Sequence, residues 1–539
     1  MKYPLRQRRT AESGASLMLA VMSLIFLVPM IGLAVDVGML YVVKARLQGA
    51  VDGASLAAAR SLNLGQTTAA QATSAKQNAV NWFYANFPPG SWLTNSTLMD
   101  TSDTHAHVYD DLVNPNLRHV DVTASSHVPT LFMNWFGVRF TNIVAYGFAS
   151  RRDVNAMLVM DRSGSMCHSS SPPCTSSDPT CGALIQASKT FTGQFSAGRD
   201  KIGAISFADN AYLHSVPTTA FQTSLGYINS FGTGNGELDT IACGGGTATP
   251  QAIALAYNEL YKINQPGALN VIVVETDGKP NTVTENFWDG AASAIAAGSS
   301  CRDANNKTKG QGGFGSSAAL PAWTGGHSMN AGGSGYMADI PAGIIGGIGG
   351  TDTGTTSFFL FNSWTTLKTN TYSEVTTGGG ATPQYSAANG CWMAMNHSTS
   401  GSANDLAWMP ATDVYGSNLV NPSYNFVNGV SGAHITDLTM NNIRAASFNA
   451  TDSVATRART NANLPVTVFA VGFTSTVDDT ILQRIANDPD WLPSASCVSS
   501  GDCVFNANQP QGTYVFAAST ADLIPAFLTL SSQILRLSR

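Results

Sequence analysis

The longest apolar stretch of the chain lies near its N-terminus, where residues 15–35 read ASLMLAVMSLIFLVPMIGLAV, 21 positions without a charge. At a rise of about 1.5 Å per residue, a helix of this length spans the roughly 30 Å core of a bilayer. A cleaved signal peptide is the alternative, but its apolar core is about 7–15 residues long and ends at a small-x-small cleavage site, which is not evident here. The pattern favours an uncleaved membrane-spanning helix at residues 15–36, preceded by a tail at residues 1–14.

Helical spacing continues beyond the apolar stretch. Apolar or small residues recur at Leu40, Leu47, Val51, Ala54 and Ala58. We expect one continuous rod, whose many Ala and Gly residues would let another helix approach closely, although an Ala-rich stretch is also simply a good helix former. A second helix is expected at residues 68–86, followed by alternating segments typical of strands. Residues 37–150 are therefore predicted to form a helical rod with a small α+β module.

This N-terminal region resembles a known family. The residues that carry the likeness are GLAVDVG at Gly32–Gly38, the Leu47-Gln48 pair and the Val51-Asp52 pair ahead of an Ala-rich run. They are similar to the N-terminal segment of TadE/TadG-like proteins of the tight-adherence (Flp) pilus system. The resemblance covers about 50 residues. It implies a single-span protein with most of its mass outside the bacterial cytoplasmic (inner) membrane.

Charge and cysteine positions indicate the orientation of this anchor. Four basic residues, Lys2, Arg6, Arg8 and Arg9, precede the span, so the positive-inside rule places the N-terminus in the cytoplasm and the bulk of the chain in the periplasm or outside. All eight cysteines follow the span, which suits an oxidising compartment and up to four disulfides. A local Cys497–Cys503 bridge is expected, but the sequence does not choose among 105 complete pairings.

Three later segments carry the chemistry. The apolar run that begins at Val154 ends in Asp-Arg-Ser-Gly-Ser, a Gly-rich loop precedes a predicted helix, and a second apolar run, LNVIVVETDG, ends in an acid. Strands that end in polar side chains have the layout of a ligand site in an open α/β sheet. The donors are all hard oxygens, which suit Mg²⁺ or Mn²⁺ better than Zn²⁺. They are Asp161, Ser163, Ser165, Thr247 and Asp277.

The order and spacing of these five residues resemble the metal-ion-dependent adhesion site (MIDAS) of von Willebrand factor type A domains. The resemblance covers residues 151–280 and about 436–539, and it implies a doubly wound, Rossmann-like α/β domain across residues 151–539. It also implies that Asp161, Ser163 and Ser165 are core ligands, with Thr247 and Asp277 binding directly or through water. Mg²⁺ is the expected ion, with Mn²⁺ or Ca²⁺ as alternatives, and an open coordination position would accept an Asp or Glu carboxylate of a protein partner.

Two features depart from the family pattern. A stretch with three cysteines follows the Ser-Gly-Ser loop, and a bridge from Cys167, Cys174 or Cys181 to Cys243 would tie two of the metal loops together. The second departure is a Gly-rich, Trp-containing insertion at about residues 281–435. Its length and aromatic content favour an inserted subdomain, with a Cys301–Cys391 bridge as one hypothesis. Whether it binds a ligand or is a packing appendage stays open.

Composition excludes several classes of protein. At 539 residues the chain has room for about three domains. Charged residues are only 12%, and beyond residue 10 there are 24 basic against 34 acidic residues, which argues against a nucleic-acid partner. The sequence has no Gly-x-Ser-x-Gly elbow, phosphate-binding P-loop or His-Glu-x-x-His motif, so we expect no enzymatic activity.

Three functional hypotheses remain. The first is a membrane-anchored envelope component of a Flp pilus assembly system that binds protein partners through the MIDAS. The second is a minor-pilin-like structural component assembled through its N-terminal helix. The third is a direct surface adhesin whose insertion supplies specificity.

Overall fold

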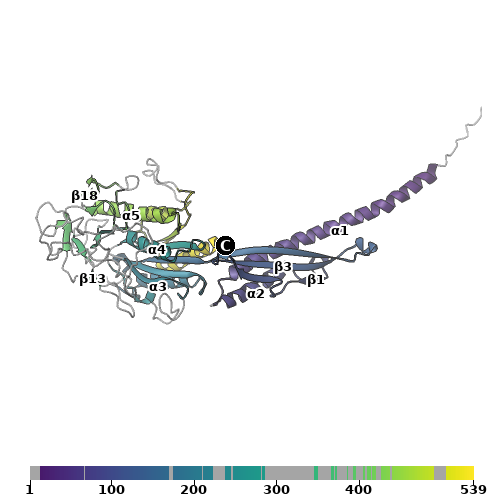
Figure 1. The fold of residues 1–539 in the computed structure, drawn as a ribbon, viewed down its shortest axis with the longest axis horizontal. Helices are drawn as coiled ribbons and strands as arrows, with labels where there is room; N and C mark the ends of the chain where they lie inside the picture. Colours follow the sequence, from purple (N-terminus) through teal and green to yellow (C-terminus); the bar gives the residue numbers. More distant parts are fainter. Residues whose placement is uncertain are drawn as a thin grey trace, which may run out of the picture. The chain divides into compact units, whose positions relative to one another are not determined.

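The computed structural model describes residues 12–65, 67–168, 174–208, 211–221, 237–244, 247–280, 411–413, 415–420, 426–436, 440–490 and 505–538, with short strands between 282 and 410. The chain divides into two compact units, residues 1–151 and residues 152–538. Each is described by itself below, with the elements labelled in Figure 1.

The first unit is organised around one long helix. Helix α1 runs without interruption over Glu12–Ser61, 50 residues, so the predicted continuation beyond the apolar stretch as a single rod is confirmed. Its segment from Leu17 is long and apolar enough to cross a membrane, and its apolar N-terminal half is exposed. Helix α2, at Thr68–Asn86, begins after Thr67, whose hydroxyl accepts the N–H of Ala70. It packs along α1 (Figure 1).

A four-stranded antiparallel sheet covers the other side of this helix pair. The long strand β3 pairs with β1 and β2 along different stretches and also with β4. Strand β4 comes so close to α1 that a Cβ on Gly147 would lie 2.9 Å from the Val51 side chain. Leu47, Phe83 and Val120 contribute to the buried core. The elements are η1 Ser91–Leu93, β1 Ser96–Leu98, β2 Ala106–Asp110, β3 Leu117–Pro129, η2 Met133–Phe136 and β4 Phe140–Arg152.

The second unit contains a six-stranded sheet in the order β20-β19-β8-β5-β6-β7. All neighbours in this sheet are parallel except β6 and β7, which are antiparallel. Strands β5 and β8 are buried along their whole length, as their apolar runs predict for central strands. The strands are β5 Val154–Asp161, β6 Lys201–Phe207, β7 Ala211–Thr218, β8 Leu269–Thr276, β19 Thr467–Phe473 and β20 Tyr514–Ala517.

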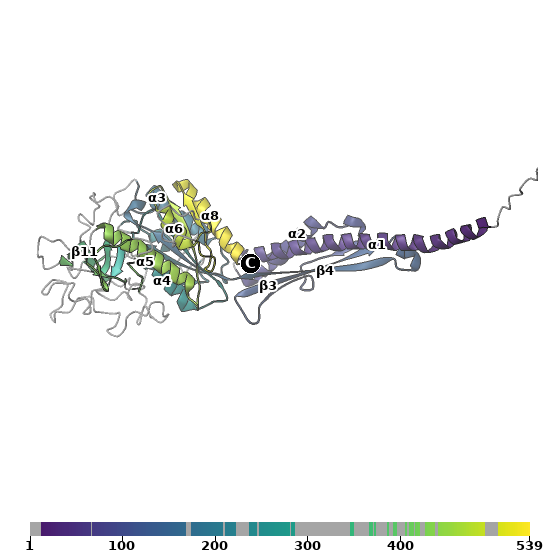
Figure 2. The same cartoon turned by 90° about the horizontal axis from the view of Figure 1, so that it is seen from above.

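Helices cover both faces of this sheet, so the predicted doubly wound α/β fold is confirmed. Helices α3 and α8 pack on one face through residues such as Phe191 and Phe527, whereas α4, α5 and α6 pack on the other. Figure 2 shows α4 beside α5. The helices are α3 Pro179–Thr192, α4 Thr249–Ile263, α5 Met440–Thr460, α6 Asp479–Ala486 and α8 Thr520–Leu537, with the short turns η3 Gly164–Met166 and η4 Glu237–Thr240.

Only fragments of the predicted insertion lie among the described residues. Five short strands form a sheet in the order β15-β14-β11-β10-β9, and two smaller sheets accompany it. The hypothetical Cys301–Cys391 and Cys497–Cys503 bridges lie outside the described residues. The strands are β9 Thr282–Glu285, β10 Ile345–Gly349, β11 Thr366–Thr369, β12 Thr371–Tyr372, β13 Tyr385–Ser386, β14 Trp392–Met395, β15 Asp405–Leu406, β16 Met409–Pro410, β17 Val430–Ser431 and β18 His434–Ile435.

Candidate metal centre

The candidate site lies where two neighbouring central strands end. Strands β5 and β8 are parallel, with Met160 opposite Glu275, so their carboxyl ends meet at the same edge of the sheet. Asp161 closes β5, and Asp277 follows directly after β8. Strand register therefore brings together residues that are far apart in sequence, at the edge where open α/β sheets usually bind ligands.

The loop after β5 turns back on its own first residue. The Ser163 backbone N–H donates to Asp161 Oδ1 at 2.7 Å, and η3 then places Ser165 so that the two serine hydroxyl oxygens are 2.9 Å apart. Ser165 Oγ donates to Asp277 Oδ1 at 2.6 Å, and Ser163 Oγ lies 3.5 Å from the same oxygen. Four of the five predicted site residues thus share one hydrogen-bonded cluster.

Thr247 reaches the same place from the loop before α4. The loop is tied to the end of β6 by a hydrogen bond from Ala248 N–H to the Ala208 carbonyl at 2.8 Å. A Cβ on Gly278 would lie 3.2 Å from Thr247 Oγ1 and 3.7 Å from Ser165 Oγ. Gly278 therefore leaves room for the two hydroxyls beside Asp277. All five predicted residues are brought together, and each is buried except the exposed Ser165.

Two further residues join the cluster without a predicted role. Thr276 donates its hydroxyl to Asp161 Oδ2. Glu275 is fully buried, and its Oε2 accepts the Asp161 backbone N–H at 3.2 Å, whereas its Oε1 has no hydrogen-bond partner in the part of the chain that the structure describes. The sequence signal for Glu275 is that it is the single charged residue of β8. One charge does not disturb the mainly apolar pattern of the strand, so the sequence pattern predicts no role for Glu275.

Burial and mutual repulsion raise the pKa values of the three carboxylic acids. Burial raises the pKa of Asp161 to about 6, and the nearby charge of Arg162 does not offset it. Burial, and then the charges of Asp161 and Asp277, raise the pKa of Glu275 well above its usual value. Burial and the charge of Asp161 do the same for Asp277. Like charges held together in a buried site favour protonation or a bound cation.

This donor set fits a hard divalent cation. Carboxylate and hydroxyl oxygens are the ligands that Mg²⁺ and Ca²⁺ prefer, and a divalent ion would offset the repulsion among the three acids. The buried Glu275 Oε1, without a protein donor among the described residues, is the kind of orphaned acceptor that an ion or its bound water satisfies. The residues present therefore fit the ion that the sequence motif implies.

Two disulfides hold the loops that carry the site. Cys181 at the start of α3 bonds to Cys243, just ahead of Thr247, so the predicted tie between metal loops is confirmed with Cys181 as the partner. Cys167 bonds to Cys174. Reciprocal backbone hydrogen bonds of 2.8 and 2.9 Å join Cys174 to Cys243, which places the Sγ atoms of Cys174, Cys181 and Cys243 within 4.8 Å of one another. Because all three are oxidised, this cluster offers no thiolate to a metal.

Comparison with protein families matches the two parts of the chain separately. Residues 14–61 match the Tad family, described as Flp pilus-assembly TadE/G-like. Residues 156–279 match the von Willebrand factor type A domain. The chain therefore combines a TadE/G-like segment with a type A domain, a domain that commonly binds a divalent metal at its MIDAS. Neither family description names an enzymatic activity.

The solved structures that match the chain share little sequence with it and superpose on it with low TM-scores. The pilus adhesin SpaC from Lactobacillus rhamnosus GG is 13% identical, with a TM-score of 0.29 over 80% of this chain, which spans only 36% of the adhesin. The PilB minor pilin from Streptococcus sanguinis is 12% identical, with a TM-score of 0.31 over 81% of this chain and 79% of the pilin. The vWF domain of the pilus tip protein Mfa5 from Porphyromonas gingivalis is 11% identical, with a TM-score of 0.32. The match covers 72% of this chain and 98% of the Mfa5 domain. No curated protein matches the chain.

Proposed function

We propose that this chain is a membrane-anchored envelope component of a Flp pilus assembly system, and that its type A domain binds a protein partner through a divalent metal ion. The observation that carries the proposal is the convergence of five oxygen-bearing side chains from three loops on one buried edge of the sheet. Ser165 and Asp277, 112 positions apart, are within hydrogen-bond distance of each other there. The TadE/G-like match over residues 14–61 supplies the pilus context.

The five residues contribute to ion binding from three loops in this proposal. Asp161, Ser163 and Ser165 hold the ion from one loop, which the Ser163 N–H to Asp161 bond keeps folded back. Thr247 and Asp277 complete the set from the two loops beside it. A bound Mg²⁺ with a coordination position left open would attract a carboxylate, so the partner would contribute an Asp or Glu side chain. Mn²⁺ and Ca²⁺ are the alternatives to Mg²⁺ at such a set of hard donors.

Helix α1 and the disulfides of the second unit support the proposed membrane anchor and compartment. Helix α1 spans the cytoplasmic membrane in this proposal, with the basic residues 2–9 in the cytoplasm and the remaining chain in the periplasm. The two disulfides among the described residues support an oxidising compartment for the second unit.

Metal binding is tested directly on the full-length protein in nanodiscs. After treatment with a chelator, Mg²⁺ is titrated calorimetrically into the wild type and into Asp161→Ala. We expect the variant to lose at least about 100-fold in affinity, because it removes a charged ligand. Asp522→Ala, which removes one exposed acidic charge outside the site, is the matched control and keeps wild-type affinity. Equal Mg²⁺ affinity in Asp161→Ala and the wild type would contradict the proposal.

Partner binding is tested in cells that assemble the pilus. Capture of envelope proteins by the tagged wild type in Mg²⁺ is compared with capture in chelator and with capture by Asp161→Ala. We expect the specific partner to be lost in both, while Asp161→Ala remains in the membrane fraction. Unchanged capture and unchanged piliation in Asp161→Ala would show that the site has no role in assembly.

A minor-pilin-like role is the second candidate, and one surface of α1 favours it. A Cβ placed on Gly38, Gly49 or Gly53 would meet no atom within 4 Å, and Val42 and Leu56 are each 44% exposed. Small and apolar residues along an exposed helix allow another helix to approach closely. The adhesin alternative depends on the insertion at residues 281–435, most of which lies outside the described residues.

A further inference from the structure

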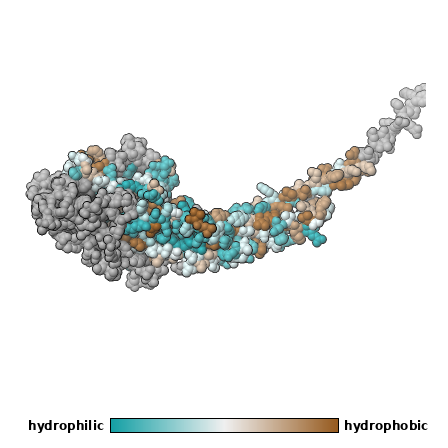
Figure 3. Space-filling model, in the orientation of Figure 1, coloured by the Kyte–Doolittle hydropathy of each residue, from teal (hydrophilic) through white to brown (hydrophobic). Residues whose placement is uncertain are grey.

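The loop that joins β3 to β4 exposes large apolar side chains. Its turn, η2, carries Trp135 and Phe136, whose surfaces are 81% and 70% exposed. Leu131, Val138 and Phe140 around it are 41–52% exposed. We call residues 130–140 the hairpin tip. Figure 3 shows hydrophobic residues, coloured brown, along the first unit. An exposed apolar patch of this kind marks a contact surface.

Asp36 fixes the hairpin tip to α1. Its side chain is fully buried, and its carboxylate accepts three successive backbone N–H groups: Oδ1 accepts from Leu131 at 2.9 Å, and Oδ2 accepts from Phe132 at 2.9 Å and from Met133 at 2.7 Å. Hydrogen bonds to a charged acceptor are stronger than neutral ones. The turn is therefore held at one level of the helix, immediately after its apolar stretch.

Gly32 allows the contact to be close. A Cβ at this position would lie 2.5 Å from the Phe132 ring and 2.8 Å from Phe132 Cβ, so any other residue would push the hairpin tip away. Gly32 is one turn before Asp36. The glycine and the acid of the GLAVDVG segment thus position the same loop, one through steric space and the other through hydrogen bonds.

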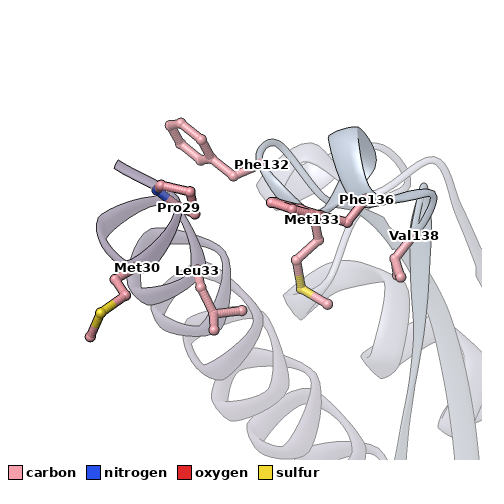
Figure 4. A pocket seen from close by; sticks show the side chains of 7 residues that line it. All are labelled: Pro29, Met30, Leu33, Phe132, Met133, Phe136 and Val138. Atoms are coloured by element: carbon pink, nitrogen blue, oxygen red, sulfur yellow. The ribbon is translucent and has the colours of Figure 1, made fainter. Parts of the chain in front are cut away.

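An apolar cavity of about 320 Å³ lies between the helix and the hairpin tip. Pro29, Met30 and Leu33 line it from α1, and Met133 and Phe136 are among those that line it from the tip (Figure 4). Every side chain of its lining is apolar. A cavity of this kind offers no hydrogen bond to a polar ligand, and its contents must be hydrocarbon or another apolar side chain.

The position of the cavity along α1 favours lipid hydrocarbon over a protein side chain as its occupant. Pro29 to Val35 is six residues, about 9 Å of helix, and Val35 ends the apolar stretch. A tip at this level lies within the roughly 5–10 Å that interfacial elements penetrate into a bilayer. Tryptophan is enriched at that depth, and the exposed Arg139 at the flank of the tip suits lipid phosphates.

We propose that the hairpin tip inserts into the outer leaflet of the membrane beside α1 and that lipid acyl chains occupy the cavity between them. The inference rests on the proposed function in one respect, namely that α1 spans the membrane. It adds a second membrane contact, made by residues about 95 positions further along the chain than Asp36, and it assigns Gly32 and Asp36 as the residues that position it.

Photo-crosslinking to lipid tests this contact. A benzophenone-bearing phenylalanine analogue replaces Phe136 in the full-length protein, which is reconstituted into phosphatidylethanolamine–phosphatidylglycerol vesicles and irradiated. The same analogue at Phe26, in the apolar stretch, is the positive control. Leu112, which is fully exposed at the opposite end of β3, about 40 Å of strand away, is the negative control. We expect lipid adducts at positions 136 and 26 in similar yield, and several-fold less at 112.

The outcomes separate the inference from the anchor on which it rests. Lipid adducts at 26 but not at 136 would overturn the inference and leave the membrane anchor intact. Adducts of position 136 with protein alone, whether a second copy or another chain, would overturn it in favour of a protein contact. Loss of lipid adducts at both positions would overturn the anchor and the inference together.

The positioning role of Asp36 has its own control. Asp36→Ala should lower the lipid adduct at position 136 several-fold and leave the adduct at position 26 unchanged. Asp52→Ala, which removes an exposed acid from the same helix, should change neither. Unchanged hydrogen-exchange protection of peptides from α2 and β2 verifies that the first unit of the variant has folded. An unchanged adduct at position 136 in a folded Asp36→Ala protein would overturn the assignment of Asp36.

Discussion

Asp36 and Asp161 are the same kind of residue in the sequence and two different kinds in the structure. Each is the first charged residue after an apolar run, and each is fully buried. Asp36 lies within helix α1 and accepts three backbone N–H groups from one loop. Asp161 ends a strand and shares its site with two other buried acids, Glu275 and Asp277.

The difference lies in what balances the negative charge. The dipoles of three N–H groups stabilise Asp36 within its own unit, so this carboxylate needs no further ligand. Around Asp161, the Glu275 Oε1 atom has no donor among the described residues, and the negative charges of the neighbouring acids repel one another. A buried acid saturated by backbone donors indicates a structural clamp, whereas a crowded and undersaturated group of acids indicates a cation site.

The largest expected effect concerns the covalent ties of the second unit. Replacing both Cys181 and Cys243 by Ala opens a loop of 62 residues and should lower the free energy of unfolding of the type A domain by about 4 kcal/mol. Replacing Cys167 and Cys174 opens a loop of seven residues and should cost about 2.5 kcal/mol. Chemical denaturation measures both. Equal losses would show that loop closure does not explain the stabilisation.

The second largest effect is expected at Asp36, whose carboxylate holds the hairpin tip against α1. Asp36→Ala removes three hydrogen bonds to a charged acceptor, and we expect the hairpin tip to open more easily by about 3 kcal/mol. Hydrogen exchange of peptides that cover residues 130–140 measures this opening, with peptides of β5 and β8 as the internal reference. Wild-type protection of the tip would mean that packing of Phe132 against Gly32 is sufficient without the acid.

A smaller effect of opposite sign is expected at the metal centre. In chelator, Glu275→Gln should raise the free energy of unfolding of the type A domain by about 1 kcal/mol, because it neutralises one of three acids that repel one another. The same change should weaken Mg²⁺ binding. Glu259→Gln is the matched control: Glu259 is also buried but pairs with Lys262 at 2.7 Å, so its loss should destabilise. Destabilisation by both variants would remove the distinction between the two types of buried acid.

The smallest expected effect tests the second candidate function. Gly49→Leu should not destabilise the first unit and should change its stability by no more than about 1 kcal/mol, because a Cβ at Gly49 would meet no atom within 4 Å beyond the helix's own backbone. Gly147→Leu, where a Cβ would lie 2.9 Å from Val51, should destabilise the unit clearly. Pili that fail to assemble with a folded Gly49→Leu protein would favour the minor-pilin-like role, and normal pili would count against it.

The sequence predicted those parts of the site that are local or follow from strand order. Asp161, Ser163 and Ser165 lie within five positions of one another, and Asp277 ends a second recognisable apolar strand. Glu275 was not predicted, because a single charge does not disturb an apolar run enough to be noticed. The partner of Cys243 stayed open among three cysteines, because the sequence does not show which of them the fold places beside it. The backbone of Cys174 pairs with that of Cys243, whereas the sulfur of Cys181 bonds to it.

The role of Asp36 could not be predicted either. Its hydrogen-bond donors are residues 131–133, about 95 positions further along the chain. Periodicity reports which face of a helix is apolar, but it carries no information about which distant turn will be placed against that face. The predicted α+β module was therefore recognisable as a set of elements, while the contact between its hairpin and the helix was not.

The Cys181–Cys243 bridge also limits when the candidate metal centre can take its final form. A bridge between residues so far apart forms only where thiols are oxidised, so in a chain exported from the cytoplasm the loop before Thr247 is secured only after translocation. The third loop of the site would stay untethered during synthesis. Partner binding through the metal ion would then depend on export, and a newly made chain would not bind its partner in the cytoplasm.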